Sequence, residues 1–154
     1  MQWEVLHAVT VHSERRTLPF AQEQIFDLVA DVERYPDFLP LWQAARSRRS
    51  EQDNDLYITD QTLQLGVVQK TFRTETRLQR PDRILVTSTD ALFDEFMIKW
   101  LLEALPEHSC RVDFSLRCKA ASPFLRPIFE VVLGSAAQSI VSAFERRALA
   151  LYSR

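Results

Sequence analysis

Hydrophobic and polar residues alternate with a period of two over much of residues 42–105 and again over residues 110–120. Successive side chains of a strand point to opposite faces, so this alternation predicts strands with one face covered and the other in water. Short hairpin connections are predicted at four polar or glycine-containing turns, namely 51–55, 65–66, 80–83 and 90–91. The side chains predicted to point inward are Val68, Phe72, Leu78, Phe96, Ile98, Trp100, Leu102, Cys110, Val112, Phe114, Leu116 and Cys118.

Two different patterns precede this region. Residues 8–18 are rich in Val and Thr and end before Pro19, which predicts an edge strand that leads into a turn. Residues 20–39 place apolar side chains at helical spacing, but Pro36 and Pro40 prevent one long helix. The second segment is therefore predicted to form two short helices or one broken helix.

The C-terminal segment, residues 122–153, has apolar residues at three- and four-residue steps, which is typical of an amphipathic helix. A single helix of about 25 to 30 residues, roughly 40 Å long, is expected. Pro127 either starts this helix in its first turn or kinks a helix that begins at Pro123. The face predicted to be buried contains Phe129, Leu133, Ala136, Ile140, Phe144, Ala148 and Leu151.

This order of elements predicts an α+β helix-grip fold, in which a curved antiparallel sheet wraps around a long C-terminal helix and two short helices follow the first strand. A length of 154 residues suits one domain with one core, covering residues 1–154. A curved sheet and a helix leave a space between them that is either an apolar ligand site or a solid core, and the pattern alone fits both.

Charge and composition limit the classes of partner and the kinds of site that are expected. The formal charge is −2 and the apolar fraction is 46%, so neither DNA binding nor disorder is expected. No run of 18 apolar residues and no signal-peptide pattern is present, which predicts a cytoplasmic protein. Cys110 and Cys118 are eight residues apart on one predicted strand, about 26 Å at 3.3 Å per residue, so they cannot form a disulfide. Three scattered His and no metal motif predict no metal site.

Several ordered motifs across nearly the whole chain carry a resemblance to a known family. The first is IFDLVADVERYPDFLP at residues 25–40, with Trp42 soon after. The others are residues 92–93 with 98–100, 112–116 and 143–148. Together they resemble the coenzyme Q-binding group of START-like proteins, also described as polyketide cyclase/dehydrase-like. Members of that group often place Trp directly after the second proline of the motif, whereas this chain has Leu41 between them.

The resemblance implies a START/Bet v 1-like helix-grip fold whose internal tunnel receives ubiquinone or a similar polyprenyl lipid in support of respiratory electron transport. Ubiquinone would be a bound ligand rather than a cofactor, and no catalytic residue is implied. The ligand-binding residues expected from the resemblance and the inward positions are Tyr35, Phe38, Trp42, Phe72, Phe93, Phe96, Trp100, Phe114, Phe129, Leu133, Ile140 and Phe144.

A second function belongs to a different class. The same resemblance covers bacterial ribosome association toxins, which bind the large ribosomal subunit and block subunit association. A cluster of Arg46, Arg48 and Arg49 could contact phosphate or lipid headgroups, or it is simply a solvated face. An enzyme would need convergent polar groups inside, and the inward faces mostly lack them.

Three polar residues and one hairpin add finer expectations. Asp60, Lys70 and Thr74 fall near inward parity, where a polar group could bind a quinone oxygen, unless a bulge turns them to water. The hairpin around Leu63, Leu65 and Val67 is apolar enough to touch a membrane, which would place the protein at the periphery of the inner membrane.

Overall fold

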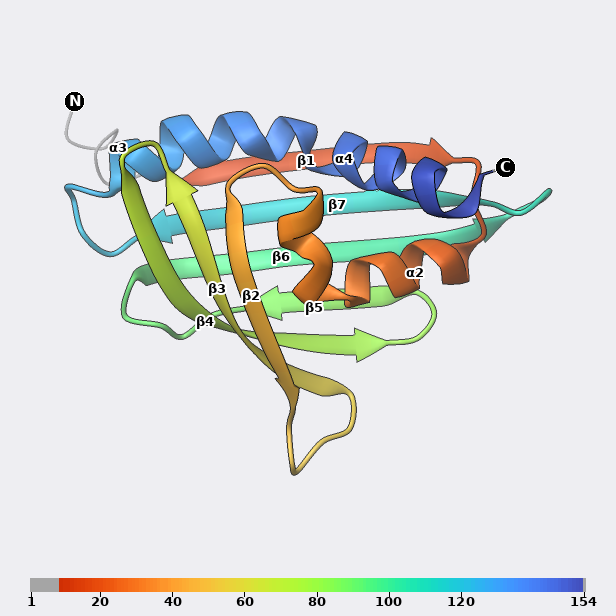
Figure 1. Ribbon diagram of the computed structural model, residues 1–154, viewed down its shortest axis with the longest axis horizontal. Coiled ribbons are helices and arrows are strands. Elements are labelled where there is room, and N and C mark those ends of the chain that lie inside the picture. The colour runs from red at the N-terminus through yellow and green to blue at the C-terminus, as the bar shows by residue number, and fades with distance from the viewer. Residues whose placement is uncertain (1–8, 154) are drawn as a thin grey trace.

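The computed structural model describes residues 9–153, which form one seven-stranded antiparallel sheet that bends around a long C-terminal helix (Figure 1). The strand order is β1-β7-β6-β5-β4-β3-β2. Strands β2 to β7 follow one another as hairpins, and β1 closes the order by pairing with β7. The strands are β1 (Thr10–Leu18), β2 (Trp42–Arg49), β3 (Leu56–Leu65), β4 (Val68–Gln79), β5 (Arg83–Thr87), β6 (Phe93–Leu105) and β7 (Ser109–Ala120). The predicted helix-grip fold is confirmed.

The inner face of the sheet follows the predicted alternation. On β7 the five even positions from Cys110 to Cys118 are all buried, and their odd neighbours are at least partly exposed. Strand β4 buries every second residue from Phe72 to Leu78. Both cysteines are free, as predicted, and burial raises the pKa of the Cys110 thiol to about 11 and that of the Cys118 thiol to about 12.

Strand β4 bends sharply, and this bend divides the sheet (Figure 1). Its register with β3 runs from Val68 to Arg77, whereas its register with β5 covers only Glu75 to Gln79. The first half of β4 therefore runs with β2 and β3, and only its last residues run with β5.

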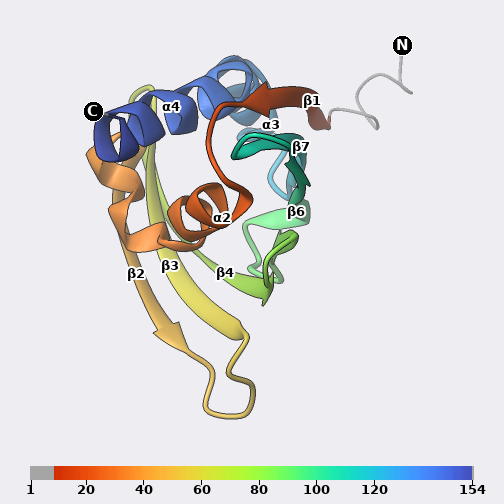
Figure 2. The same cartoon turned by 90° about the vertical axis from the view of Figure 1, so that its right-hand side faces the viewer.

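Two short helices close one side of the concave face, as Figure 2 shows. They are α2 (Gln22–Ala30) and the 3₁₀ helix η1 (Val32–Asp37), which confirms the predicted helical pair. Helix α2 buries Ile25, Phe26, Leu28 and Val29 because these residues fall on one side at helical spacing.

The C-terminal helix runs without interruption from Arg126 to Tyr152 and has three parts. These are α3 (Arg126–Ile128), the π-helical turn η2 (Phe129–Leu133) and α4 (Gly134–Tyr152). Pro127 lies in the first turn, where its missing N–H leaves no bond unmade, so it starts the helix. The helix is long and apolar enough to cross a membrane by composition, but its apolar side packs against the sheet.

Three sequence-based expectations need correction. Leu151 is 51% exposed, because Tyr152 and not Leu151 continues the packed side of the helix, with its ring 6.3 Å from that of Phe20. Asp60 points outward and pairs with Arg73, because the odd positions of β3 face the core. Of the large apolar side chains in the β3–β4 hairpin, only Val67 is fully exposed, whereas Leu63 and Leu65 are buried in the core. The predicted first strand begins at Thr10, and Ala8 lies outside the described residues.

Candidate functional site

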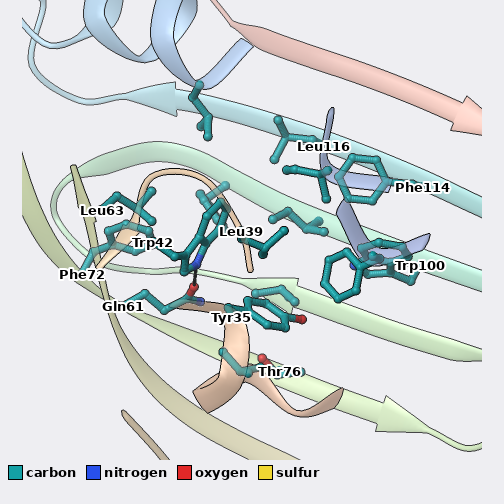
Figure 3. Close-up of a pocket in the computed structure, with 17 residues that line it drawn as sticks. Tyr35, Leu39, Trp42, Gln61, Leu63, Phe72, Thr76, Trp100, Phe114 and Leu116 are labelled. Atoms are coloured by element: carbon teal, nitrogen blue, oxygen red, sulfur yellow. Dashed lines mark hydrogen bonds between the residues drawn. The ribbon is translucent and has the colours of Figure 1, made fainter. Parts of the chain in front are cut away.

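An apolar cavity of about 30 Å³ lies between the sheet, η1 and α4 (Figure 3). Strands β2 to β7 supply most of its wall, η1 contributes Val32 and Tyr35, and the C-terminal helix contributes Leu133, Ile140 and Phe144. A volume of this size holds about one water molecule. The space is thus narrow because large side chains fill most of it.

Aromatic rings make up much of the wall and contact one another edge to face. Phe144 of α4 lies at the centre: its ring is 4.9 Å from that of Trp100, 5.4 Å from that of Tyr35 and 5.0 Å from that of Phe38. Trp100 in turn lies 4.7 Å from Phe114. Such tilted contacts stabilise packing beyond the area that they bury. They also present flat apolar surfaces to anything that enters.

The structure brings nine of the twelve predicted ligand-binding residues to the cavity wall. These are Tyr35, Trp42, Phe72, Phe96, Trp100, Phe114, Leu133, Ile140 and Phe144. The other three lie just behind them: Phe93 and Phe129 are buried with ring centroids 5.5 Å apart, and Phe38 is half-buried under the guanidinium of Arg147. Whether these residues bind a ligand stays a prediction.

A row of buried polar side chains on β3 and β4 interrupts the apolar wall. Trp42 Nε1 donates to Gln61 Oε1 at 2.7 Å (Figure 3). Gln61 Nε2 in turn donates to Thr74 Oγ1 at 2.9 Å. Thr59 continues the row through a 3.0 Å bond to Ser47 Oγ. Gln61 reaches the cavity surface, and its amide is held in place by both partners.

Thr76 differs from the other members of this row. Its hydroxyl lies on the cavity wall, is buried, and has no hydrogen-bond partner among residues 9–153. Sequence reasoning identified Thr74 but missed Gln61 and Thr76. The parity of Phe72 and Leu78 on the same strand was the signal that could have placed Thr76 inside.

Tyr35 and Trp42 are held in place by the chain around them. The Tyr35 hydroxyl donates to the carbonyl of Val29, and burial raises its pKa, so it stays protonated. Leu41 adopts a left-handed conformation with φ of 76°, and the β2–β3 register shifts between Trp42 and Ala44. The left-handed turn at Leu41 precedes the strand, and the bulge leaves Gln43 unpaired, so Trp42 points into the cavity despite the altered spacing.

Comparison with known proteins agrees with this fold. The family described as "Polyketide cyclase / dehydrase and lipid transport" matches residues 18–145. The ribosome association toxin RatA of Pseudomonas aeruginosa is 32% identical over 94% of this chain and 99% of its own, and that of Escherichia coli K12 is 29% identical over 92% and 88%.

Solved structures with the same fold have lower identity. A START superfamily protein from Mycobacterium smegmatis superposes with a TM-score of 0.76 at 17% identity, over 92% of this chain and 98% of its own. The Zhui aromatase/cyclase from Streptomyces gives 0.76 at 13%, over 91% and 93%. The relatives named above carry no enzyme name, although this fold also serves cyclases. The chain belongs to the START-like polyketide cyclase/dehydrase and lipid transport family.

Proposed function

We propose that this protein binds ubiquinone or a related polyprenyl lipid in the cavity and acts as a carrier that supports respiratory electron transport. The observation that carries the proposal is the unpartnered Thr76 hydroxyl on a wall that is mostly apolar and aromatic and whose other polar residue, Gln61, is already bonded. A buried hydroxyl without a partner costs about 1–3 kcal/mol. A ligand oxygen that accepts a hydrogen bond from Thr76 recovers this cost, and a quinone carbonyl is such an acceptor.

The apolar wall supplies the remaining affinity. Each buried CH₂ of a ligand contributes about 0.8 kcal/mol, so a few enclosed isoprene units are sufficient for micromolar binding after ordering costs. The cavity of about 30 Å³ is too small for a quinone ring, so lining side chains must move when the ligand enters. A long tail would protrude, because a domain of this length has a radius of gyration of about 15 Å.

The test is organic extraction of the purified full chain followed by mass spectrometry, together with uptake of short-chain ubiquinone. Thr76→Val removes the hydroxyl while keeping the shape, and it should weaken quinone affinity about fivefold to tenfold. Thr17→Val, on the exposed face of β1, is the matched control and should leave affinity unchanged. A wild type that is empty and also fails to take up added quinone would contradict the proposal.

A second function is favoured by the relatives' name. Proteins that are 29–32% identical over more than nine-tenths of this chain are called ribosome association toxins. Strand β2 is an edge of the sheet and exposes Arg46, Arg48 and Arg49. Arg49 lies over the ring of Tyr57, and no ion pair holds Arg46 among residues 9–153. These cations are suited to phosphate oxygens of ribosomal RNA, which would place the protein in the cytoplasm.

Co-sedimentation with purified large ribosomal subunits tests this second function. Binding should fall as salt rises, and Arg46→Glu with Arg48→Glu should abolish it. Arg83→Glu with Arg146→Glu, two exposed arginines on β5 and α4, is a matched control for net charge. Equal loss in both double variants would indicate non-specific attraction and argue against a β2 contact.

A further inference from the structure

The bend in β4 leaves an interruption in the sheet between β4 and β6. Residues 68–74 of β4 pair with β3 on one side, but β5 pairs only from Glu75 onward. Strand β6 likewise pairs with β5 only from Met97 to Leu101, so Phe93 to Phe96 have no neighbour on that side. No backbone ladder joins the two strands at this place.

Three phenylalanine rings fill the interruption and are called the aromatic plug below. Phe72 of β4 lies 4.9 Å from Phe93 and 5.6 Å from Phe96 of β6, and the last two rings are 4.8 Å apart. Side chains, rather than hydrogen-bonded strands, thus separate the inside of the protein from the outside here.

Of the three rings of the aromatic plug, Phe72 is the one that borders both the inside and the outside of the sheet. Phe72 lines the inner cavity and also borders an outer hollow of about 360 Å³ on the opposite face of the sheet. The two spaces are therefore separated by one residue. Rotation or removal of this ring would connect them.

The loop between β5 and β6 borders the same outer hollow as Phe72 and is joined to β4 by side-chain hydrogen bonds. Ser88 Oγ donates to the carbonyl of Arg73 at 2.6 Å, and the Arg73 backbone N–H donates to Asp90 Oδ2 at 3.0 Å. Asp90 N in turn donates to Ser88 Oγ at 3.1 Å. Exposed side-chain bonds of this kind open more readily than a sheet ladder does.

The outer hollow carries an excess of negative charge. Asp60, Glu75 and Asp90 line it together with one cation, Arg73, which is paired with Asp60 at 2.9 Å. Among the residues that line the hollow, three carboxylates and one guanidinium leave a charge of −2. A hollow of this sign repels anions and admits neutral molecules.

We propose that the aromatic plug is a gate through the sheet, closed by Phe72 and held by Ser88 and Asp90, which admits uncharged molecules to the cavity and excludes anions. The statement that a lipid passes through this gate rests on the proposed function. The existence of the gate itself is tested without any lipid.

Tryptophan fluorescence gives a direct readout, because Trp42 and Trp100 both line the cavity and are almost fully buried. Trp3, which lies outside the described residues, is first replaced by Phe to remove its emission. Neutral acrylamide and anionic iodide are then compared as quenchers at constant ionic strength. Phe72→Ala should raise the acrylamide quenching constant at least about threefold, because acrylamide can then reach the tryptophans without local opening of the protein. The iodide quenching constant should stay nearly unchanged.

The control for loss of a buried ring is Phe26→Ala, because Phe26 on the inner side of α2 is fully buried and does not line the cavity. It should not raise acrylamide quenching. A folded Phe72→Ala protein with unchanged acrylamide quenching would overturn the gate. An equal rise for iodide would overturn its selectivity for neutral molecules.

A second variant keeps the test decisive if Phe72→Ala fails to fold. Ser88→Ala with Asp90→Ala removes the bonds that hold the loop without altering the core, and it should also raise acrylamide quenching. Ser50→Ala with Asp53→Ala removes the same kinds of side chain from the β2–β3 turn, where both cap backbone N–H groups. Equal quenching in the two double variants would count against the gate.

A measurement of ubiquinone uptake distinguishes the gate from the proposed function. The Ser88/Asp90 variant should take up short-chain ubiquinone faster than wild type with an unchanged dissociation constant, because the bonds act on opening and not on the bound state. Faster acrylamide access without any quinone binding would sustain the gate and refute the proposed function. Quinone binding at an unchanged rate would refute the gate as its route.

Discussion

The inner face of β7 and the inner face of β3 and β4 are equally buried but differ in chemistry. On β7 the inward residues are Cys110, Val112, Phe114, Leu116 and Cys118. On β3 and β4 they include Thr59, Gln61, Thr74 and Thr76. A polar group removed from water costs free energy unless it is bonded, so packing alone does not explain the second wall.

Most polar side chains on the wall of β3 and β4 offset the cost of burial by hydrogen bonds to one another or to neighbouring side chains. Gln61 bonds with Trp42 and Thr74, and Thr59 bonds with Ser47, whereas Thr76 has no partner among the described residues. The β7 wall therefore stabilises the fold, whereas the wall of β3 and β4 holds one unsatisfied group toward the cavity. Only the latter is suited to recognise a ligand atom.

The largest effect is expected on the β7 wall. Phe114→Ala removes a fully buried ring that packs 4.7 Å from Trp100, and should lower the free energy of unfolding by about 3–5 kcal/mol. Urea unfolding followed by circular dichroism measures this loss. A loss below about 1 kcal/mol would mean that the residues around the cavity move to fill the space left by the Phe114 ring.

An intermediate effect is expected from the bonded part of the polar wall. Gln61→Leu keeps the volume but leaves Trp42 Nε1 without an acceptor and Thr74 Oγ1 without its donor, so the protein should lose about 2 kcal/mol. Gln64→Leu on the same strand is the control, because its amide bonds only the exposed Gly66 carbonyl. Similar losses in both variants would remove the distinction between the two glutamines.

Thr76→Val should have the opposite sign. It removes a hydroxyl without a partner while preserving shape, so the free energy of unfolding should rise by about 1 kcal/mol as quinone affinity falls. The same urea titration measures the first change. Destabilisation by Thr76→Val would indicate that the hydroxyl is satisfied in solution and would weaken the case for recognition.

The sequence allowed one of these walls to be predicted and concealed part of the other. On β7 every second residue is apolar, so parity assigned each side chain correctly. On β3, Leu56 and Ile58 are apolar at even positions while Leu63 and Leu65 are apolar at odd ones. This mixed pattern explains why Asp60 was predicted inward and Gln61 was missed.

Two local backbone features could not be predicted from the pattern of residue types. The π-helical turn of Phe129–Leu133 and the left-handed Leu41 have no signal in residue type, because neither contains glycine or proline. The interruption between β4 and β6 is also invisible from sequence, since it depends on where tertiary pairing stops along a strand whose alternation continues.

The smallest effect is expected on the outer side of the same strand pair, where Asp60 bonds Arg73 at 2.9 Å. That bond lowers the pKa of Asp60 below its ordinary value, so its contribution to stability is present above the unfolded-state pKa and is lost as the pH falls through the folded-state pKa. Because about half of both side chains is exposed, solvent screening leaves only a small part of this contribution. Asp60→Asn should therefore cost much less than Gln61→Leu at neutral pH, and the difference from wild type should vanish in acid and shrink in high salt. A cost equal to that of Gln61→Leu would mean that the β3–β4 pair depends on its outer face as much as on its buried one, and the contrast between the two faces of this strand pair would no longer hold.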